Sequence, residues 1–433
     1  MELQNNKFCL ITLGCRVNVL ESEKIINTLV DAGMEFVPDN SKEADIFVVN
    51  TCCVTNKAES KSRNDINTAI RLANKLVIVC GCYSQITDLK SLNEKVGIII
   101  GSKYKFSLPE LIKKYNGERI IKVDDLSKED TFENYEDFHF VQHTRAFLKI
   151  QDGCNYNCSY CVIPLARGKQ RSMKFENAIK IINNYIAKGF KEVVLTGVNT
   201  AGYNDNGQSF YDLLNTINKI EGDFRIRISS LEPFQITDEI IDLLTKNKQR
   251  WVQSFHLCLQ SADDKILNEM NRKYSCDFFK ELIQKFRAKS NYCSITTDYI
   301  VGFPTETREQ FEQSLIKLDE LNFSDMHIFP FSLKKGTVAE RFKNLVADSE
   351  KTKRFDTILK NATKNKVIYL NKFIGQNVRV LFEKSTHKGI QRGHSEYFFD
   401  VYVNTDEIYT NTFKFVKIIK IEDAMVYGEI VID

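Results

Sequence analysis

Short, almost wholly apolar runs alternate with helical stretches over the first 116 residues of this chain of 433 residues. Helices are expected at about 19–32 and 57–74, between the runs FCLITLG, ADIFVVN, KLVIVCG and VGIIIGS. A strand that is apolar along its whole length is buried on both faces, which is typical of a parallel sheet with helices on either side. Residues 1–116 are therefore predicted to form a doubly wound parallel α/β domain.

Residues 117–143 break this pattern because they are acidic and carry no clear period, so we expect a linker there. From 144 onward the alternation resumes with six strand candidates: AFLKI, EVVLTG, RIRISS, SFHLCLQ, SITTDYIVG and SDMHIFPFS. Six strand–helix units are too few for an eight-stranded barrel and too many for a small doubly wound domain. Residues 144–365 are therefore predicted to form a partial (β/α)6 barrel of the TIM type, with its chemistry at the carboxyl ends of the strands.

The last part of the chain, 372–433, changes character. It has strand-like segments and no helical period, as in NVRVLFEK, YFFDVYV and FKFVKIIKI. A small all-β domain is predicted there.

Composition sets the expected compartment. No run approaches the roughly 20 apolar residues of a membrane-spanning helix, and the first residues do not resemble a signal peptide. The twelve cysteines are then interpreted as metal ligands or reduced thiols rather than disulfides. We therefore expect a cytoplasmic protein with no membrane contact. Because the net charge is only +3, binding to a nucleic acid would need a local basic patch.

Three cysteines, Cys154, Cys158 and Cys161, follow the first strand candidate of the central region. Thiolates favour iron–sulfur clusters or zinc. Three ligands leave one iron of a four-iron cluster without a protein ligand, and an open metal position can bind a small molecule. A zinc site would need a fourth ligand, and the nearest histidine, His143, precedes Cys154 by eleven residues. The spacing therefore favours a reactive cluster over a structural metal site.

A second set of three cysteines follows three strand candidates of the amino-terminal region. Cys15 follows FCLITLG, Cys52 follows DIFVVNT and Cys82 follows KLVIVCG. The carboxyl ends of parallel strands meet at one edge of a sheet, where doubly wound domains bind ligands. The three thiols are therefore expected to meet, although free cysteine is also a common small core residue. Cys9 and Cys80 are expected in the core, and Cys53 is expected to point away from Cys52.

These motifs resemble those of the radical S-adenosylmethionine (SAM) methylthiotransferases. The cysteine loop, with Tyr160 before its last cysteine, is similar to the radical SAM signature, and TLGCRVN, VVNTC and CGCYSQ are similar to the cluster segments of the amino-terminal methylthiotransferase domain. The resemblance continues through VLTGVN, RIRISSLEP, LQSADDKILNEMNRKY, YIVGFPTET and HIFPFSLKKGT, and the tail is similar to a TRAM-type RNA-binding module. Within the family, KIQDGCN, NTCCVTNKAESKSR and IPLARGKQRS resemble the branch that acts on N6-threonylcarbamoyladenosine beside the tRNA anticodon.

The resemblance implies two 4Fe–4S clusters. The cluster on Cys154, Cys158 and Cys161 would bind SAM and cleave it reductively to methionine and a 5′-deoxyadenosyl radical, which would abstract hydrogen from C2 of adenine. The cluster on Cys15, Cys52 and Cys82 would carry the sulfur, methylated by a second SAM, that is delivered to C2. The two clusters should therefore lie close together.

Further SAM contacts are predicted at the ends of the barrel strands. They are Gly197, Val198 and Asn199 for the amino group, Ser229, Ser230 and Glu232 near the ribose, Tyr160 for the adenine, and Gln260 and Asp298 on later strands. Each of them could instead have a structural role in the barrel.

Basic residues in three places could contact the anticodon stem-loop of tRNA. They are Lys57, Lys61, Arg63, Arg71 and Lys75; Arg167, Lys169 and Arg171; and, in the tail, Lys372, Arg379, Lys384, Lys388 and Arg392 beside Tyr397, Phe398 and Phe399. Phosphate contacts position a nucleic acid, and aromatic side chains suit single-stranded or loop RNA. The simpler interpretation of any one of these charges is a solvated surface.

The expected function is thus methylthiolation of threonylcarbamoyladenosine in tRNA. The family also implies a sulfur source and an electron donor such as a flavodoxin-type protein. Alternatives that keep the chemistry act on isopentenyl-adenosine tRNA or on an aspartate of a ribosomal protein. Alternatives of other kinds are a radical SAM RNA methyltransferase and an RNA-binding protein with structural clusters.

Overall fold

The computed structural model describes residues 3–38, 42–133, 140, 144–384 and 389–431. It divides into two compact units. Unit 1 comprises Met1–Gln142, Gln151–Met173 and Ser332–Glu340, and unit 2 comprises His143–Ile150, Lys174–Phe331 and Arg341–Asp433. The cysteine loop after the first barrel strand therefore belongs to the same unit as the amino-terminal sheet.

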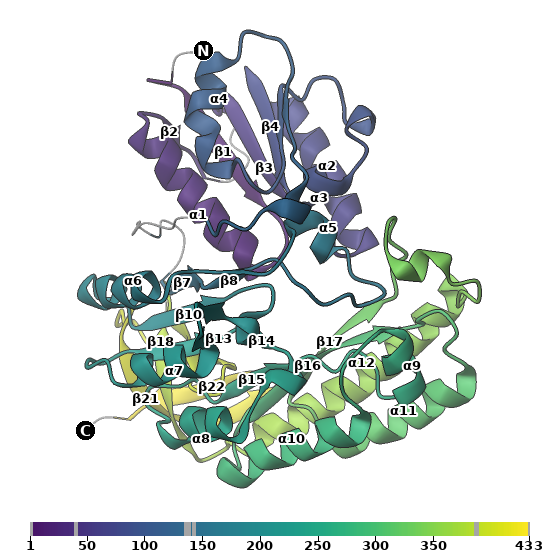
Figure 1. Ribbon diagram of the computed structural model, residues 1–433. Helices are drawn as coiled ribbons and strands as arrows, with labels where there is room; N and C mark the ends of the chain where they lie inside the picture. The colour runs from purple at the N-terminus through teal and green to yellow at the C-terminus, as the bar shows by residue number, and fades with distance from the viewer. Residues whose placement is uncertain (1–2, 39–41, 134–139, 141–143, 385–388, 432–433) are drawn as a thin grey trace. The chain divides into compact units, whose positions relative to one another are not determined.

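Unit 1 is built on a six-stranded parallel sheet in the order β2-β1-β3-β4-β5-β6 (Figure 1). The four predicted strands are confirmed. They are β1 (Lys7–Thr12), β3 (Ile46–Thr51), β4 (Leu76–Gly81) and β5 (Ile98–Ile100). The short edge strands β2 (Glu35–Phe36) and β6 (Ile120–Lys122) were not expected. Because β6 lies within 117–143, the predicted linker contributes a strand to the sheet.

Helices cover both faces of this sheet. Helices α1 (Arg16–Asp31) and α4 (Leu108–Lys114) bury Ile25, Leu29 and Ile112 in one core with strand residues such as Val48. Helix α2 (Asn56–Leu72) buries Ile66 and Ala69 in a second core with Phe47 and Val49, the alternate residues of β3. Side chains of a strand alternate between faces. The α/β class is confirmed, and the fully apolar strands are explained by two buried faces.

Unit 2 contains the six parallel strands predicted for the central region, and all six are confirmed. β7 (Ala146–Lys149), β10 (Glu192–Thr196) and β13 (Arg225–Ile228) pair in one group. β15 (Ser254–Leu257), β16 (Ser294–Val301) and β17 (Asp325–Pro330) pair in the other, with the short strand β14 (Ser230–Leu231) at its edge. A parallel bridge between Ile226 and Trp251 joins the groups.

Helices alternate with these strands. They are α6 (Phe175–Ala187), α7 (Phe210–Asn218), α8 (Asp238–Lys246), α9 (Asp264–Glu269), α10 (Cys276–Lys289) and α11 (Arg308–Leu321). The strand–helix alternation read from the sequence is thus present throughout this part of unit 2.

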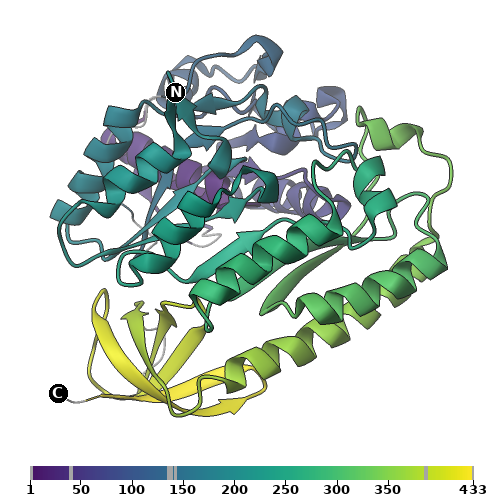
Figure 2. The ribbon, with the colours of Figure 1, turned by 60° about the horizontal axis from the view of Figure 1, so that its bottom comes forward.

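A small closed barrel ends the chain (Figure 2). Its strands run in the order β18-β19-β20-β22-β21, and they are β18 (Asn377–Phe382), β19 (Ile390–Ser395), β20 (Asp400–Asn404), β21 (Phe413–Glu422) and β22 (Met425–Ile430). The long helix α12 (Asp348–Asn371) leads into it, and Tyr369 and Leu370 at its end pack in the barrel core. The predicted all-β tail is confirmed. Among the described residues, no helix is both long and apolar enough to span a membrane.

Candidate active site

The three amino-terminal cysteines lie at the carboxyl ends of three neighbouring strands of unit 1. Cys15 precedes α1, Cys52 follows β3, and Cys82 begins the short helix α3 (Cys82–Ile86) directly after β4. The pKa of the Cys52 thiol is raised to about 11. Burial contributes most to this rise, and the nearby Cys82 and Cys15 contribute as well. The structure therefore brings these three predicted residues together.

Two asparagines of the sequence motifs hold this edge in place. Asn18 donates through Nδ2 to the carbonyl oxygens of Leu13 and Thr51 at 2.6 and 3.0 Å. Asn50 donates through Nδ2 to the carbonyl oxygen of Asn18 at 3.1 Å and to Oγ of Ser22 at 3.0 Å. Buried backbone groups need partners, and these amides supply them where the strands end.

Gly81 explains the CGC motif. Its φ of +101° is in the region that favours glycine, and an added Cβ would lie 2.6 Å from the carbonyl oxygen of Thr51. The chain can turn into α3 at this point only because Gly81 has no side chain. That turn sets the position of Cys82.

The second set of cysteines lies on the loop between β8 (Gln151–Asp152) and the short helix α5 (Ile163–Arg167). Cys154, Cys158 and Cys161 are all partly exposed. The backbone N–H groups of Tyr156 and Ile163 point at Sγ of Cys154 and Cys161, at 3.4 and 3.5 Å. Hydrogen bonds to sulfur are among the features that tune iron–sulfur clusters, so this loop has the donors that a cluster would use.

A buried ionic network links this loop to α1. The guanidinium of Arg167 donates to the Glu21 carboxylate at 2.9 and 3.1 Å, to Asp152 at 3.2 Å, and to Oδ1 of Asn18 at 2.7 Å. Lys105 also donates to Glu21, and its side chain is fully buried. Because the network joins Asn18, beside the first cysteine set, to the end of the second loop, it fixes the two cysteine-bearing segments within one unit.

The electrostatic setting of Cys82 differs from that of Cys52. A hydrogen bond donated by the Cys53 thiol lowers the pKa of Cys82, and the positive charges of Arg167 and Lys105 lower it further. The same hydrogen bond, together with burial, raises the pKa of Cys53. The expectation that Cys53 points away from Cys52 depended on the strand continuing, whereas β3 ends at Thr51 and the Cys53 thiol contacts Cys82. Cys80 is buried in the opposite core, as expected.

A third segment of unit 1 reaches the same region. Oγ of Ser332 accepts from the backbone N–H of Asn56 at 3.2 Å, and the buried Lys334 pairs with Glu59 of α2 at 2.8 Å. Ala339 donates to the carbonyl oxygen of Ser159, between the second and third cysteines of the loop, at 2.7 Å. Sequence reasoning included SLKKGT in the family resemblance but did not place it beside the cysteine loop.

The predicted SAM contacts of unit 2 fall at strand ends, with varied surroundings. Gly197 and Val198 are partly exposed after β10, and Asn199 is buried beside them. Ser229 is buried, and its hydroxyl lies 3.0 Å from that of Thr200. Glu232 is paired with Arg272, although burial raises its pKa overall. Ser230, in β14, and Tyr160, in unit 1, are half-buried.

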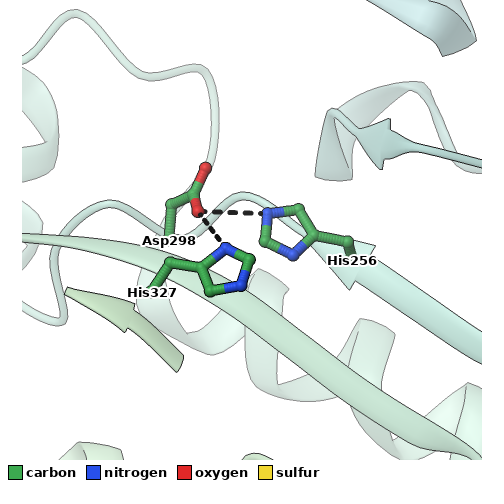
Figure 3. Close-up of side chains that lie close together, drawn as sticks. All are labelled: His256, Asp298 and His327. Carbon is green, nitrogen blue, oxygen red and sulfur yellow. Dashed lines mark hydrogen bonds and ion pairs between the residues drawn. The ribbon is translucent and has the colours of Figure 1, made fainter. Parts of the chain in front are cut away.

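Asp298 lies in β16, and Gln260 follows β15. Gln260 has a φ of +68°, and its backbone bonds to that of Asp298 and Ile300 at 2.9 Å. Oδ1 of Asp298 is 3.3 Å from Nε2 of His256 and 3.2 Å from Nδ1 of His327 (Figure 3). Sequence reasoning missed both histidines, although they lie within the strand candidates SFHLCLQ and SDMHIFPFS.

The basic residues divide into exposed and internally paired groups. Those on and after α2, and Lys169, are exposed, as RNA contact requires. Arg167 was wrongly expected to reach RNA, since it is 1% exposed and paired. In the tail, Lys372 and Lys384 are exposed, whereas Lys388 lies outside the described residues. The remaining tail residues have partners within the fold: Arg379 with Asp223, Arg392 with Asp400, Phe398 with Arg227, and Tyr397 and Phe399 with Phe373. Arg171 donates to the carbonyl oxygens of Arg167 and Lys169.

Known protein families and individual proteins match the sequence of this chain. Residues 148–318 match the Radical SAM superfamily, and residues 7–101 match the Uncharacterized protein family UPF0004. The threonylcarbamoyladenosine tRNA methylthiotransferase MtaB of Thermotoga maritima is 36% identical over 89% of this chain and 89% of its own. The protein of the same name from Bacillus subtilis is 38% identical over 80% of this chain and 78% of its own.

A solved structure agrees at the level of fold. The radical S-adenosylmethionine methyltransferase TsrM from Kitasatospora setae is 13% identical, with a TM-score of 0.55, and the alignment covers 76% of this chain and 75% of TsrM. At that identity the likeness concerns the fold alone. The two relatives and the matched families confirm the resemblance seen in the sequence motifs: this chain belongs to the radical SAM methylthiotransferase family, and within it to the MtaB type.

Proposed function

We propose that this protein converts N6-threonylcarbamoyladenosine beside the anticodon of tRNA to its 2-methylthio derivative. The observation that carries the proposal is the presence of two separate sets of three cysteines in one compact unit. Methyl transfer alone would not need a second set. Relatives 36% and 38% identical over most of the chain carry the name of this activity.

The donor sets fit 4Fe–4S clusters with one open iron each. Cys15, Cys154, Cys158 and Cys161 are at least partly exposed, whereas Cys52 and Cys82 are buried. When bound, the clusters supply reductive cleavage of SAM at the loop and sulfur for transfer at the strand edge. The neighbouring Lys105 and Arg167 place positive charge near Cys82, which favours the thiolate that a metal ligand requires.

The rest of the chain would bind SAM and RNA. Gly197, Val198, Asn199, Ser229, Glu232, Gln260 and Asp298 remain our candidates for SAM contacts at the carboxyl ends of a partial barrel, with Tyr160 on the cysteine loop. The closed barrel at the end of unit 2 would act as a TRAM-like RNA-binding domain. The domain limits 1–116, 144–365 and 372–433 remain predictions, as do a cytoplasmic location, a sulfur source and a flavodoxin-type electron donor.

Mass spectrometry of tRNA nucleosides from the host, with and without this gene, tests the proposal. Loss of 2-methylthio-N6-threonylcarbamoyladenosine, with accumulation of the form that lacks methylthio, is the expected result. Loss of the isopentenyl counterpart alone would keep the chemistry and overturn the substrate. No change in any tRNA nucleoside would overturn the proposal and direct attention to the ribosomal protein.

A further inference from the structure

We propose that His327 and Phe329, two residues apart on β17, read the substrate nucleoside: Phe329 stacks on the base, and His327 contacts the carboxylate of its N6 threonyl group. This inference rests on the proposed function and deepens it. The chemistry that would be recognised is a purine with an anionic, hydroxylated side chain.

These residues lie on one face of the sheet. The rings of His256 and His327 stack with their centroids 5.3 Å apart, although β16 lies between their strands. Strands two positions apart are separated by about 10 Å, so the two side chains lean toward each other beside Asp298 of β16. The residues that alternate with them, such as Phe255, Tyr299 and Met326, are buried on the opposite face.

The imidazole of His327 is held on one edge and open to solvent. Its Nδ1 is 3.2 Å from Oδ1 of Asp298, yet its side chain is 61% exposed. His256 is only 12% exposed and has both nitrogens occupied, Nε2 by Asp298 and Nδ1 by Oγ1 of Thr296 at 2.9 Å (Figure 3). Asp298 stays ionised, because the hydrogen bonds from His256 and His327 lower its pKa against the effect of burial. His256, Thr296 and Asp298 therefore position His327.

Phe329 is the second, independent observation. The ring is 37% exposed, and the unbroken register from Thr296–Asp325 to Val301–Pro330 puts it on the same face as His327. Residues two apart along a strand are about 6.6 Å apart, which is near the span from a purine ring to the end of a substituent on N6. Phe329 is the nearer of the two to the carboxyl end of the strand, where barrels carry their chemistry.

This arrangement suits a threonylcarbamoyl group better than an isopentenyl group. An imidazole gains a hydrogen bond from a carboxylate or hydroxyl and gains nothing comparable from a hydrocarbon chain. A site built to bond a polar group discriminates strongly against an analogue that lacks it. The competing occupant is a divalent cation, since two histidines and a carboxylate can also ligate a metal.

The test uses reconstituted full-length enzyme and three anticodon stem-loops, which carry threonylcarbamoyladenosine, its methyl ester, or unmodified adenosine. His327→Asn keeps a donor at the Nδ1 position toward Asp298 but removes the outer nitrogen, whereas His327→Gln restores a polar atom there. For H327N we expect KM for the threonylcarbamoyl loop to rise about tenfold, with equal KM values for the free acid and the ester. H327Q should recover part of the difference, and KM for SAM should not move.

Phe329→Leu should raise KM for all three loops, and Phe278→Leu, at a ring 40% exposed on α10, is its matched control. If H327N still prefers the free acid to the ester, the inference is overturned. It is also overturned if wild type retains one equivalent of Zn²⁺ after equilibrium dialysis, H327N does not, and wild type binds the three loops equally well. If wild type binds the threonylcarbamoyl loop best yet methylthiolates none of the three, the proposed function fails and the recognition site stands.

Discussion

A carboxylate between two nitrogen-bearing side chains occurs in both units, in opposite surroundings. In unit 1, Glu21 lies between Lys105 and Arg167, and none of these side chains is more than 1% exposed. In unit 2, Asp298 lies between His256 and His327, and exposure rises from 12% to 61% across that group. Burial thus gives the first group a structural role, whereas the second group is exposed enough to contact a substrate.

Physical chemistry explains why the buried group must be complete. A charge removed from water is stabilised only when paired ions and further hydrogen bonds replace its hydration. Glu21, Arg167 and Asn18 meet that demand together, and they tie α1 to the end of α5. The open group needs less compensation because water still reaches His327.

Replacing Arg167 with Met should have the largest effect. It leaves Glu21 and Asp152 buried with one partner fewer, and removal of one partner from a buried ion pair costs about 3–5 kcal/mol. We expect faster hydrogen exchange of the α1 amides and loss of iron from both cysteine sets. The exposed Lys169→Met is the control. An R167M variant with normal iron content and normal protection of the α1 amides would show that the network does not hold α1 and the cysteine sets in place.

Replacing one cysteine of either set should have the next largest effect. Cys158→Ala should abolish both formation of 5′-deoxyadenosine and methylthiolation, whereas Cys52→Ala should keep the first and lose the second. Each variant should retain about half of the iron, because each removes one cluster. Cys293→Ala, at a buried cysteine of unit 2, should lose none. Equal loss of both activities in C52A would contradict the division of roles between the sets.

The sequence predicted the strands of both units because fully apolar runs and period-two segments report burial directly. It also predicted that Cys15, Cys52 and Cys82 meet, since the edge of a parallel sheet is fixed by topology. It missed β2 and β6, which are only two and three residues long. It also misread Arg167, because a basic residue near a predicted site gives no sign of whether it is buried. The pairing of His256 with His327 joins β15 and β17, which are not neighbours in the sheet, and no local sequence pattern records such a contact.

Glu396 is a half-buried carboxyl group that belongs to neither of these two groups. It accepts from the backbone N–H of Arg379 at 2.7 Å, and burial raises its pKa to about 7. A raised pKa means that the folded state holds the proton more tightly, so stability falls as pH rises from about 4.5 to about 7. Glu396→Gln should remove that loss and stabilise unit 2 by up to roughly 3 kcal/mol above pH 7, with no gain below pH 4.

Trp251, the one tryptophan of the chain, lies in unit 2, so its fluorescence reports the unfolding of that unit in urea. Wild type and E396Q should have the same midpoint at pH 4 and diverge by pH 8. The exposed Glu422→Gln should show no such divergence. Parallel pH profiles for wild type and E396Q would mean that Glu396 keeps an ordinary pKa in the fold.

Thr296→Val should have the smallest effect and probes the open group most finely. The substitution removes the hydroxyl beside Nδ1 of His256 and leaves the contact of Asp298 with His327 in place. One neutral hydrogen bond contributes about 0.5–1.5 kcal/mol, so KM for the threonylcarbamoyl loop should rise about threefold, with little change for unmodified adenosine. Because the hydroxyl of Thr296 bonds to His256, such a selective change would show that recognition passes through His256 and Asp298. A uniform change for all loops would instead mean that Thr296 supports only the fold of the sheet.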